Sequence, residues 1–322
     1  MTDDRHGGTD PARGQRWGAL ALGTVAVAAL AWWAVMLGVP AWRGWFRAGD
    51  VPDASFLSLA APDLPLFVGG NAVGGFLLWR HPDSPWRERI VWLALGATLY
   101  PTAFVVAETV RTDGEGWAAS MAMLSATAVV SLVAWATRPG GRAFEPAAAR
   151  PRWVHQGLTA IYSAFFWGMF LGLGPWLLVQ AEAALGVPRI GGAASVSWWP
   201  WLWGGLGGGC GTVNLWSGYV MSRFGEGTPL PQDTARRLVI RGPYRMVRNP
   251  MAASGVAMVF CLGMGLRSFA VAGAALAGAV AWHLGARPPE EADLARRFGA
   301  AYDRYRHAVP LWRLRWPPVP PS

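Results

Sequence analysis

The 322-residue chain has no lysine, only two cysteines and few charged residues of either sign. All 28 basic residues are arginine, and charged residues make up 15% of the sequence, against about 25% in soluble domains. The absence of lysine excludes a phosphate-binding loop of the kind that uses a Lys side chain. Cys210 and Cys261 alone support neither a disulfide framework nor a zinc site, and five scattered histidines lack ligand spacing, so no metal is expected.

Apolar residues are abundant instead: 53% of the chain is hydrophobic, with 21 tryptophans, and the mean hydropathy is positive. This content excludes a disordered chain. We therefore expect an all-α fold, a polytopic membrane bundle of about eight transmembrane helices followed by a C-terminal amphipathic cytoplasmic helix. The predicted spans are residues 17–39, 64–79, 90–107, 117–136, 158–179, 198–221, 252–266 and 268–285.

Arginine placement predicts the orientation of these spans. With eight spans, one side of the membrane holds 23 arginines and the other side holds five. The positive-inside rule then places both termini in the cytoplasm, as in a multi-pass plasma-membrane protein. The net charge of +9 is therefore explained by orientation and by contact with anionic lipid, and it does not indicate a nucleic-acid partner.

Polar residues of the second half of the chain concentrate in two blocks, residues 224–251 and 283–310. Because the intervening segment 252–285 reads as a tight helical hairpin, both blocks should lie at the same membrane face and can meet. In the first block, Gly242-Pro243 and Asn249-Pro250 mark two breaks. A plain positive-inside loop explains single arginines there, but it needs neither the paired turns nor the tyrosine between them.

The second block begins with Pro288-Pro289, after which Glu290, Glu291 and Asp293 occupy a first helical turn. Carboxylates there interact favourably with the helix dipole, which is one explanation for them. The helix that follows has an apolar face with basic residues opposite, as in an interfacial helix on anionic lipid. Acidic side chains facing arginines in a partly desolvated mouth should be paired or should bind a ligand, and a small zwitterion fits. His283 is a lone histidine at a helix end, a position that usually has an interfacial role.

The motifs resemble a known family at this point. Gly242-Pro-Tyr-Arg-x-Val-Arg-Asn-Pro-Met251, followed by Glu290-Glu291-x-x-Leu294, Phe298-Gly299, Tyr302, Tyr305 and Val309-Pro310, resembles the isoprenylcysteine carboxyl methyltransferases and the related phospholipid methyltransferases. The upstream Gly225-x-Gly-Thr-Pro-x-Pro231 is similar to the bacterial branch. The pattern covers roughly residues 222–310 and is specific in order and spacing.

The resemblance implies a transferase that binds S-adenosylmethionine from the cytosol and methylates a lipophilic small-molecule or lipid acceptor entering from the bilayer, with membrane lipids as further partners. The implied cofactor-binding residues are Tyr244, Arg248, Asn249, Pro250, His283, Glu290 and Glu291. Arg287 and Glu290 are the catalytic candidates: Arg287 would orient an acceptor carboxylate or balance charge near it. Methyl transfer needs alignment and exclusion of water more than strong acid–base groups, so the lack of a catalytic triad is expected.

One departure from the family pattern and two alternatives remain. Ala252 stands where the family commonly has Tyr, and the following Gly is displaced by one position. A sterol-type reductase that binds a nicotinamide cofactor (NADPH) resembles this hairpin too, and a catalytically inactive lipid-binding protein would tolerate the missing Tyr. The Glu290-Glu291 pair favours the methyltransferase. The acceptor, the atom methylated and the oligomeric state stay open.

We predict four regions along the chain. They are a disordered cytoplasmic tail (1–16), an N-terminal transmembrane region of unknown role (17–196), a methyltransferase-like membrane core with the cofactor site (197–312) and a Pro-rich tail (313–322).

Overall fold

The computed structural model describes residues 11–47, 49, 51–81, 86–136, 146–191, 197–229 and 233–321. By their contacts the residues divide into two units, Met1–Arg142 and Ala143–Ser322. The predicted N-terminal tail lies outside the described residues up to position 10, and its remainder forms the first turns of a helix that begins at Pro11.

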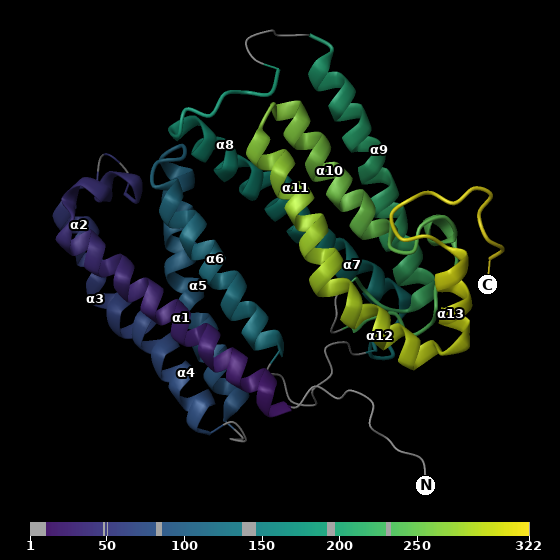
Figure 1. The fold of residues 1–322 in the computed structure, drawn as a ribbon, viewed down its shortest axis with the longest axis horizontal. Coiled ribbons are helices and arrows are strands. Elements are labelled where there is room, and N and C mark those ends of the chain that lie inside the picture. Colours follow the sequence, from purple (N-terminus) through teal and green to yellow (C-terminus); the bar gives the residue numbers. More distant parts are fainter. Residues whose placement is uncertain are drawn as a thin grey trace. The chain divides into compact units, whose positions relative to one another are not determined.

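Unit 1 consists of helices around one apolar core (Figure 1). Its helices are α1 (Pro11–Gly38), α2 (Asp53–Ser58), α3 (Ala60–Pro62), α4 (Gly69–Arg80), α5 (Arg87–Arg111) and α6 (Trp117–Ala136). α1 packs on α4 and α6, and α5 packs on α4 and α6. Gly75 lets α1 and α4 cross closely, because a Cβ atom there would lie 2.9 Å from the Ala19 carbonyl oxygen.

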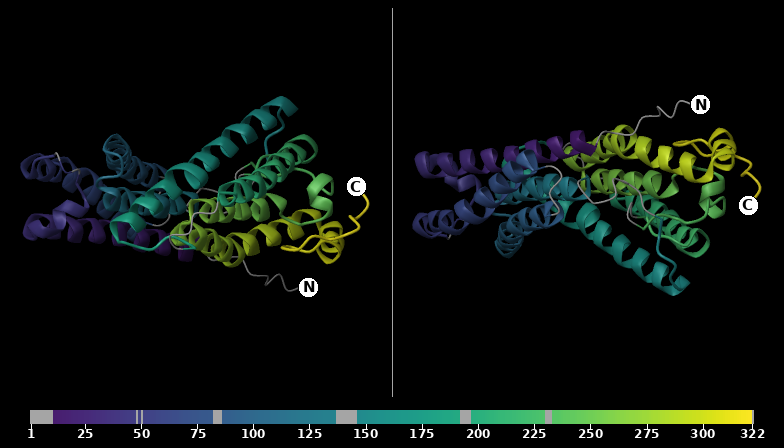
Figure 2. Two further views of the ribbon diagram at one scale, coloured as in Figure 1. Left: turned by 90° about the horizontal axis from the view of Figure 1, so that it is seen from above. Right: turned by 90° about the horizontal axis from the view of Figure 1, so that it is seen from below.

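Unit 2 is also helical, and two pairs of its helices are joined by π-helical turns without a break. Its helices are α7 (Arg152–Trp167), α8 (Gly174–Ala184), α9 (Trp199–Val220), α10 (Pro250–Leu266), α11 (Phe269–Ala281), α12 (Arg287–Phe298) and α13 (Ala300–Ala308). The π-helical segment Gly168–Leu173 joins α7 to α8, so that Figure 2 shows them as one long helix. Trp282–Ala286 joins α11 to α12 in the same way.

Six helices of the described part are long and apolar enough to cross a membrane. They are Trp17–Gly38, Asp53–Arg80, Arg89–Arg111, Trp117–Ala134, Arg152–Ala184 and Phe269–Phe298, and Pro250–Leu266 is a shorter apolar helix. The prediction of an all-helical, multi-pass membrane protein is confirmed. The predicted count of eight is not confirmed, because α10 is short and α9, which is rich in Gly and Trp, is not among the six.

The boundary between the units lies earlier in the chain than the predicted boundary at residues 196 and 197. α7 and α8 belong to unit 2, because α7 packs on α9 and α8 packs on α11. The segment before α7 also joins unit 2, through a backbone hydrogen bond of 2.9 Å from Ala147 N to Thr234 O. Composition alone does not separate α7 and α8 from the spans of unit 1.

The hairpin α10–α11 brings the two polar blocks to one end of unit 2. Its turn contains Arg267 in the left-handed region, at φ 57°, and Ser268, whose side chain caps α11 by accepting a hydrogen bond from Val271 N. The helices touch at Gly263, where a Cβ atom would lie 2.4 Å from Ala272 N. Glycine is therefore required at this crossing.

We expect Gly263→Ala to destabilise unit 2 by about 1–3 kcal/mol, because the added methyl group overlaps the backbone of α11. The measurement is the unfolding transition of the purified chain in mixed micelles. Gly278→Ala in α11 is the matched control, because a Cβ atom at Gly278 meets nothing within 4 Å. Equal stability of the two variants would contradict the close crossing.

Candidate functional site

The loop before α10 is shaped by its glycine and prolines. Gly242 adopts φ 51° and starts a short 3-10 turn, Gly242–Arg245, that buries Tyr244. Asn249 then caps α10: its side-chain oxygen accepts a hydrogen bond of 3.1 Å from Ala252 N, and Pro250 occupies the first helical position. The two predicted breaks are present, and they hold the segment from Tyr244 to Arg248 between them.

The two polar blocks meet at Glu291. Its Oε1 atom lies 3.1 Å from Nη1 of Arg248 in the first block, and its Oε2 atom accepts a hydrogen bond of 3.2 Å from Nη1 of Arg287, one turn earlier on the same helix. The Arg248 and Glu291 side chains are 14% and 15% exposed. Partly buried pairs of this kind are screened less by water and salt than surface pairs. One carboxylate thus joins arginines from both blocks.

Glu290 is adjacent to this pair, but it makes no ion pair or hydrogen bond with any residue that the structure describes. Burial, together with the nearby Glu291 and Asp293 carboxylates, raises its pKa to about 7. Helix Phe269–Phe298 would be about 45 Å long, and a bilayer core is about 30 Å thick. Since charged residues avoid the apolar layer, we expect the charged end from Arg287 onward, which includes Glu290, to project beyond it.

Tyr305 of α13 and Tyr244 of the loop connect these two segments beside the cluster. Tyr305, which is buried, donates a hydrogen bond of 2.8 Å from its hydroxyl to the Tyr244 carbonyl oxygen. The Tyr244 hydroxyl is itself buried and has no hydrogen-bond partner in the described part of the chain. Burial raises the pKa of Tyr244, Tyr302 and Tyr305 above the usual value for tyrosine, and so these side chains stay neutral.

The structure separates the predicted site residues into two groups. Tyr244, Arg248, Arg287, Glu290 and Glu291 form one cluster. Asn249 and Pro250 adjoin the cluster, but the contacts that the structure gives them are those of the N-terminus of α10. His283 lies one turn before Arg287, whose Nε donates to the His283 carbonyl oxygen at 3.2 Å, and the imidazole accepts a hydrogen bond from Trp312. Its ring therefore already has an indole partner.

Asp293 and Arg297 also belong to this site, although the sequence pattern indicated no role there for either residue. Asp293 is 3% exposed and forms ion pairs with Arg296 and Arg297. Arg297 also donates a hydrogen bond of 2.7 Å to the Ala235 carbonyl oxygen, which ties α12 to the first polar block. The Arg-rich face of the interfacial helix was the signal, but the pattern could not separate Arg297 from its exposed neighbours.

The chain after α13 is folded back onto the site, although its prolines predicted a tail. We name residues 310–321 the C-terminal strap. Its backbone makes three hydrogen bonds with the loop: Arg248 N to Pro310 O, Arg315 N to Met246 O and Val319 N to Arg245 O. Val319 is buried against Tyr302, Tyr305 and Val309. The strap thus covers the loop that carries Tyr244 and Arg248.

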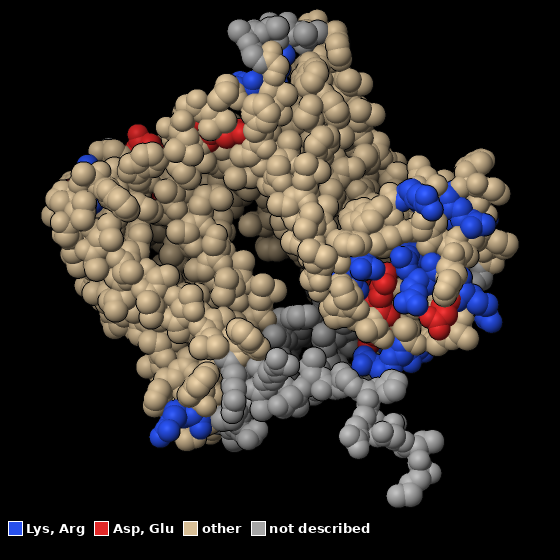
Figure 3. Space-filling model, in the orientation of Figure 1, with Lys and Arg blue, Asp and Glu red and all other residues tan. Residues whose placement is uncertain are grey.

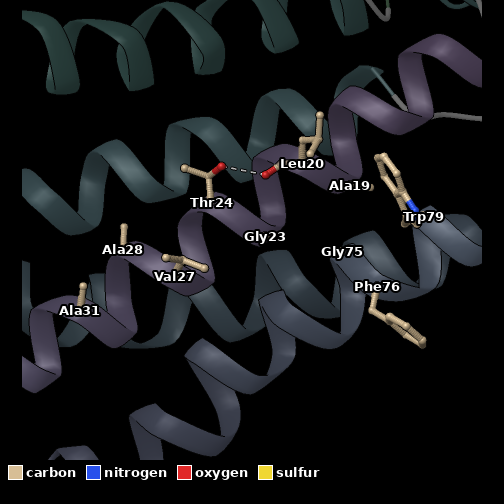
Figure 4. A pocket seen from close by; sticks show the side chains of 10 residues that line it. All are labelled: Ala19, Leu20, Gly23, Thr24, Val27, Ala28, Ala31, Gly75, Phe76 and Trp79. Atoms are coloured by element: carbon tan, nitrogen blue, oxygen red, sulfur yellow. Dashed lines mark hydrogen bonds between the residues drawn. The ribbon is translucent and has the colours of Figure 1, made fainter.

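Charged side chains gather at this end of unit 2. Figure 3 shows them over α12 and α13, whereas the surface over α9, α10 and α11 is almost free of charge. Unit 1 has a groove of about 570 Å³ between α1 and α4, lined by apolar side chains such as Val27 and Phe76 (Figure 4). In the described ranges no group of three or more His, Cys, Asp or Glu side chains is placed to hold a metal ion.

Comparison with known proteins gives one family. Residues 206–301, less than a third of the chain, match the family model of the phospholipid methyltransferases. The match covers α10, α11 and α12 and includes the Arg248–Glu291–Arg287 cluster. No curated protein and no solved structure matches the chain. The resemblance drawn from the motifs is thereby confirmed for this segment, and of the activities considered, the match indicates a membrane methyltransferase. A bacterial branch stays a prediction.

We expect Arg248 and Glu291 to be energetically coupled by about 1–3 kcal/mol in a double-mutant cycle of Arg248→Met and Glu291→Met, since each single change leaves a partly buried charge with fewer partners. The measurement is the free energy of unfolding of all four proteins. The pair Arg306 and Asp303, at 3.9 Å and about half exposed, should show a coupling of about 0–1 kcal/mol. Equal coupling for both pairs would contradict a central role for Glu291.

Proposed function

We propose that this chain, whose residues 206–301 belong to the phospholipid methyltransferase family, uses S-adenosylmethionine to methylate a lipophilic acceptor at the cytoplasmic membrane face. The observation that carries the proposal is the cluster of Arg248, Arg287 and Glu291 beside the unpaired Glu290, within the matched segment. An activity like that of the isoprenylcysteine carboxyl methyltransferases is the finer form of this proposal. Both termini would be cytoplasmic, in the plasma membrane of a bacterium.

The charges of the cluster fit a ligand that carries both signs. Two guanidinium groups share one carboxylate, Glu291, so the trio has a net positive charge that suits the cofactor's carboxylate. The Nε atom of Arg248 is buried without a hydrogen-bond partner in the described part. Glu290 has its carboxylate free and suits a cationic group. Polar atoms of both signs without a protein partner suit a small zwitterion.

The two glutamates have different roles in this proposal. Glu291 is already engaged by Arg248 and Arg287, so it holds both guanidinium groups in place. Glu290 is available, and we assign it to the ammonium or sulfonium charge of the cofactor. Asn249 and Pro250 fix the start of α10 and thereby the position of Arg248. The His283 carbonyl oxygen accepts a hydrogen bond from Nε of Arg287 and so helps to hold the Arg287 side chain.

Methyl transfer requires that the protein align the methyl donor with the acceptor and exclude water from the site. When bound, the cofactor supplies a methyl group on a sulfonium, which the acceptor attacks in line. The chain contributes fixed charges: the arginines hold one end of the ligand, and Glu290 holds the other. The buried tyrosines and the strap exclude water from the loop side. Arg287, whose side chain is 25% exposed, is placed to reach an acceptor's acidic group as well.

The cofactor assignment is tested by calorimetry of the purified chain with S-adenosylmethionine and with its demethylated product. Glu290→Gln should weaken binding of S-adenosylmethionine by at least about tenfold, because a charge-assisted contact is lost. Asp303→Asn, on exposed α13, is the control and should bind normally. Absence of binding to the unaltered chain, together with binding of a reduced nicotinamide cofactor, would overturn the proposal.

Binding should also depend on pH. Since the pKa of Glu290 is raised to about 7, its carboxylate is largely protonated at pH 6 and ionised at pH 8. A cationic ligand binds the ionised form, so affinity should rise from pH 6 to pH 8, by up to about tenfold, and a bound cation lowers the pKa of Glu290. In Glu290→Gln this rise should disappear. The same pH dependence in both proteins would remove Glu290 from the site.

The acceptor class is tested with a methyl-labelled donor. Membranes from cells with and without the chain are incubated with the label, and lipid and protein fractions are separated. Label in a lipid that depends on the chain, and that is lost in Arg248→Met, is the expected result. Label confined to protein would contradict a lipid acceptor, although it would leave the methyltransferase proposal intact.

A further inference from the structure

The C-terminal strap carries a pattern of side chains that the proposed function does not use. From residue 312 to residue 316 apolar and basic residues alternate, as Trp-Arg-Leu-Arg-Trp. Trp312, Leu314 and Trp316 are 42%, 72% and 81% exposed. Large apolar side chains exposed together on a folded segment mark an interaction surface.

These side chains are held outward, since the backbone of the strap is fixed from behind. Arg315 N and Val319 N both bond to the loop, and Val319 is buried in the core beneath the strap. The Arg315 guanidinium adds a hydrogen bond of 2.7 Å to the Ala308 carbonyl oxygen. The strap is therefore a docked segment, and the exposure of Leu314 and Trp316 belongs to its folded form.

The contacts of Trp312 show which part of the helix Phe269–Phe298 the strap lies beside. Its ring centre lies 5.4 Å from that of Trp282, and its Nε1 donates to Nδ1 of His283 at 3.1 Å. Trp282 directly follows α11 and precedes the charged turn that begins at Arg287. The strap thus lies where the helix passes from apolar to charged sequence. Tryptophan is enriched at that depth of a membrane, where its ring meets the headgroups.

The charge around the strap favours a negatively charged partner surface. Exposed arginines surround it on α13 and on the strap itself: Arg304, Arg306, Arg313 and Arg315. Asp303 is the one acidic residue among positions 300–321. Figure 3 shows this excess of basic side chains toward the C-terminal end of unit 2. Tryptophan and leucine interleaved with arginine fit anionic headgroups above an apolar layer.

We propose that the C-terminal strap docks on anionic lipid at the surface of the membrane that unit 2 spans. Trp312, Leu314 and Trp316 enter the interfacial layer, and Arg304 and Arg313 contact the headgroups. This inference does not depend on the proposed methyl transfer, because it uses neither the cofactor nor Glu290.

The test follows an environment-sensitive fluorophore attached at Leu314→Cys, in a chain with Cys210 and Cys261 changed to Ala. The chain is placed, one copy per disc, in lipid nanodiscs of phosphatidylcholine alone or mixed with phosphatidylglycerol. Quenching by neutral acrylamide should fall by at least about twofold in the anionic discs, with emission shifted to shorter wavelength. A label at Leu185→Cys, an exposed position after α8, controls for general effects of lipid charge.

Arg304→Gln with Arg313→Gln should abolish the difference between the two kinds of disc while the unfolding transition stays unchanged, since both side chains are exposed. The proposal is overturned if the label at residue 314 is quenched equally in both discs, if the change matches that at residue 185, or if protection requires two copies in one disc. The last outcome would indicate a contact between copies of the chain. None of these outcomes depends on cofactor binding, so methyl transfer is judged separately.

Discussion

The candidate site depends on one carboxylate. Glu291 forms ion pairs with Arg287 of its own helix and with Arg248 of a loop more than forty residues earlier. It therefore joins the two polar blocks. Without it, two guanidinium groups of like charge would face each other in a partly buried space. Its neighbour Glu290 has no ion-pair partner among the residues that the structure describes. Adjacent glutamates in the sequence thus differ in their contacts, since only Glu291 joins the two polar blocks.

The packing of the hairpin makes that encounter possible. α10 and α11 touch through Gly263, and the unbroken helix from Phe269 to Phe298 carries Glu290 and Glu291 past the apolar layer. The loop before α10 is set by the Asn249 cap and by Tyr305, which bonds to the Tyr244 carbonyl. The apolar helices therefore fix where the charged residues lie, and the Asn249 cap and the Tyr305 hydrogen bond fix the loop that carries Arg248.

Much of this could be predicted from the sequence, since it follows from periodicity and from local breaks. Apolar runs predicted the helices, and the tight hairpin predicted that the two polar blocks would lie at the same membrane face, where they can meet. Contacts between distant segments could not be predicted in the same way. Nothing in the composition of α7 and α8 distinguishes them from the spans of unit 1, and the prolines after residue 316 indicated a tail. The strap is held by backbone hydrogen bonds and by Val319, and backbone bonding leaves no mark in the sequence.

The strap has a consequence for how the loop and α13 depend on each other. Arg245 bonds through its guanidinium to the Val319 carbonyl, 74 residues later in the chain. The Val319 side chain is buried against Tyr302 and Tyr305 of α13, and Tyr305 bonds back to the Tyr244 carbonyl oxygen of the loop. The loop, α13 and the strap thus form a closed ring of contacts, so that loosening any one of them weakens the hold on the other two.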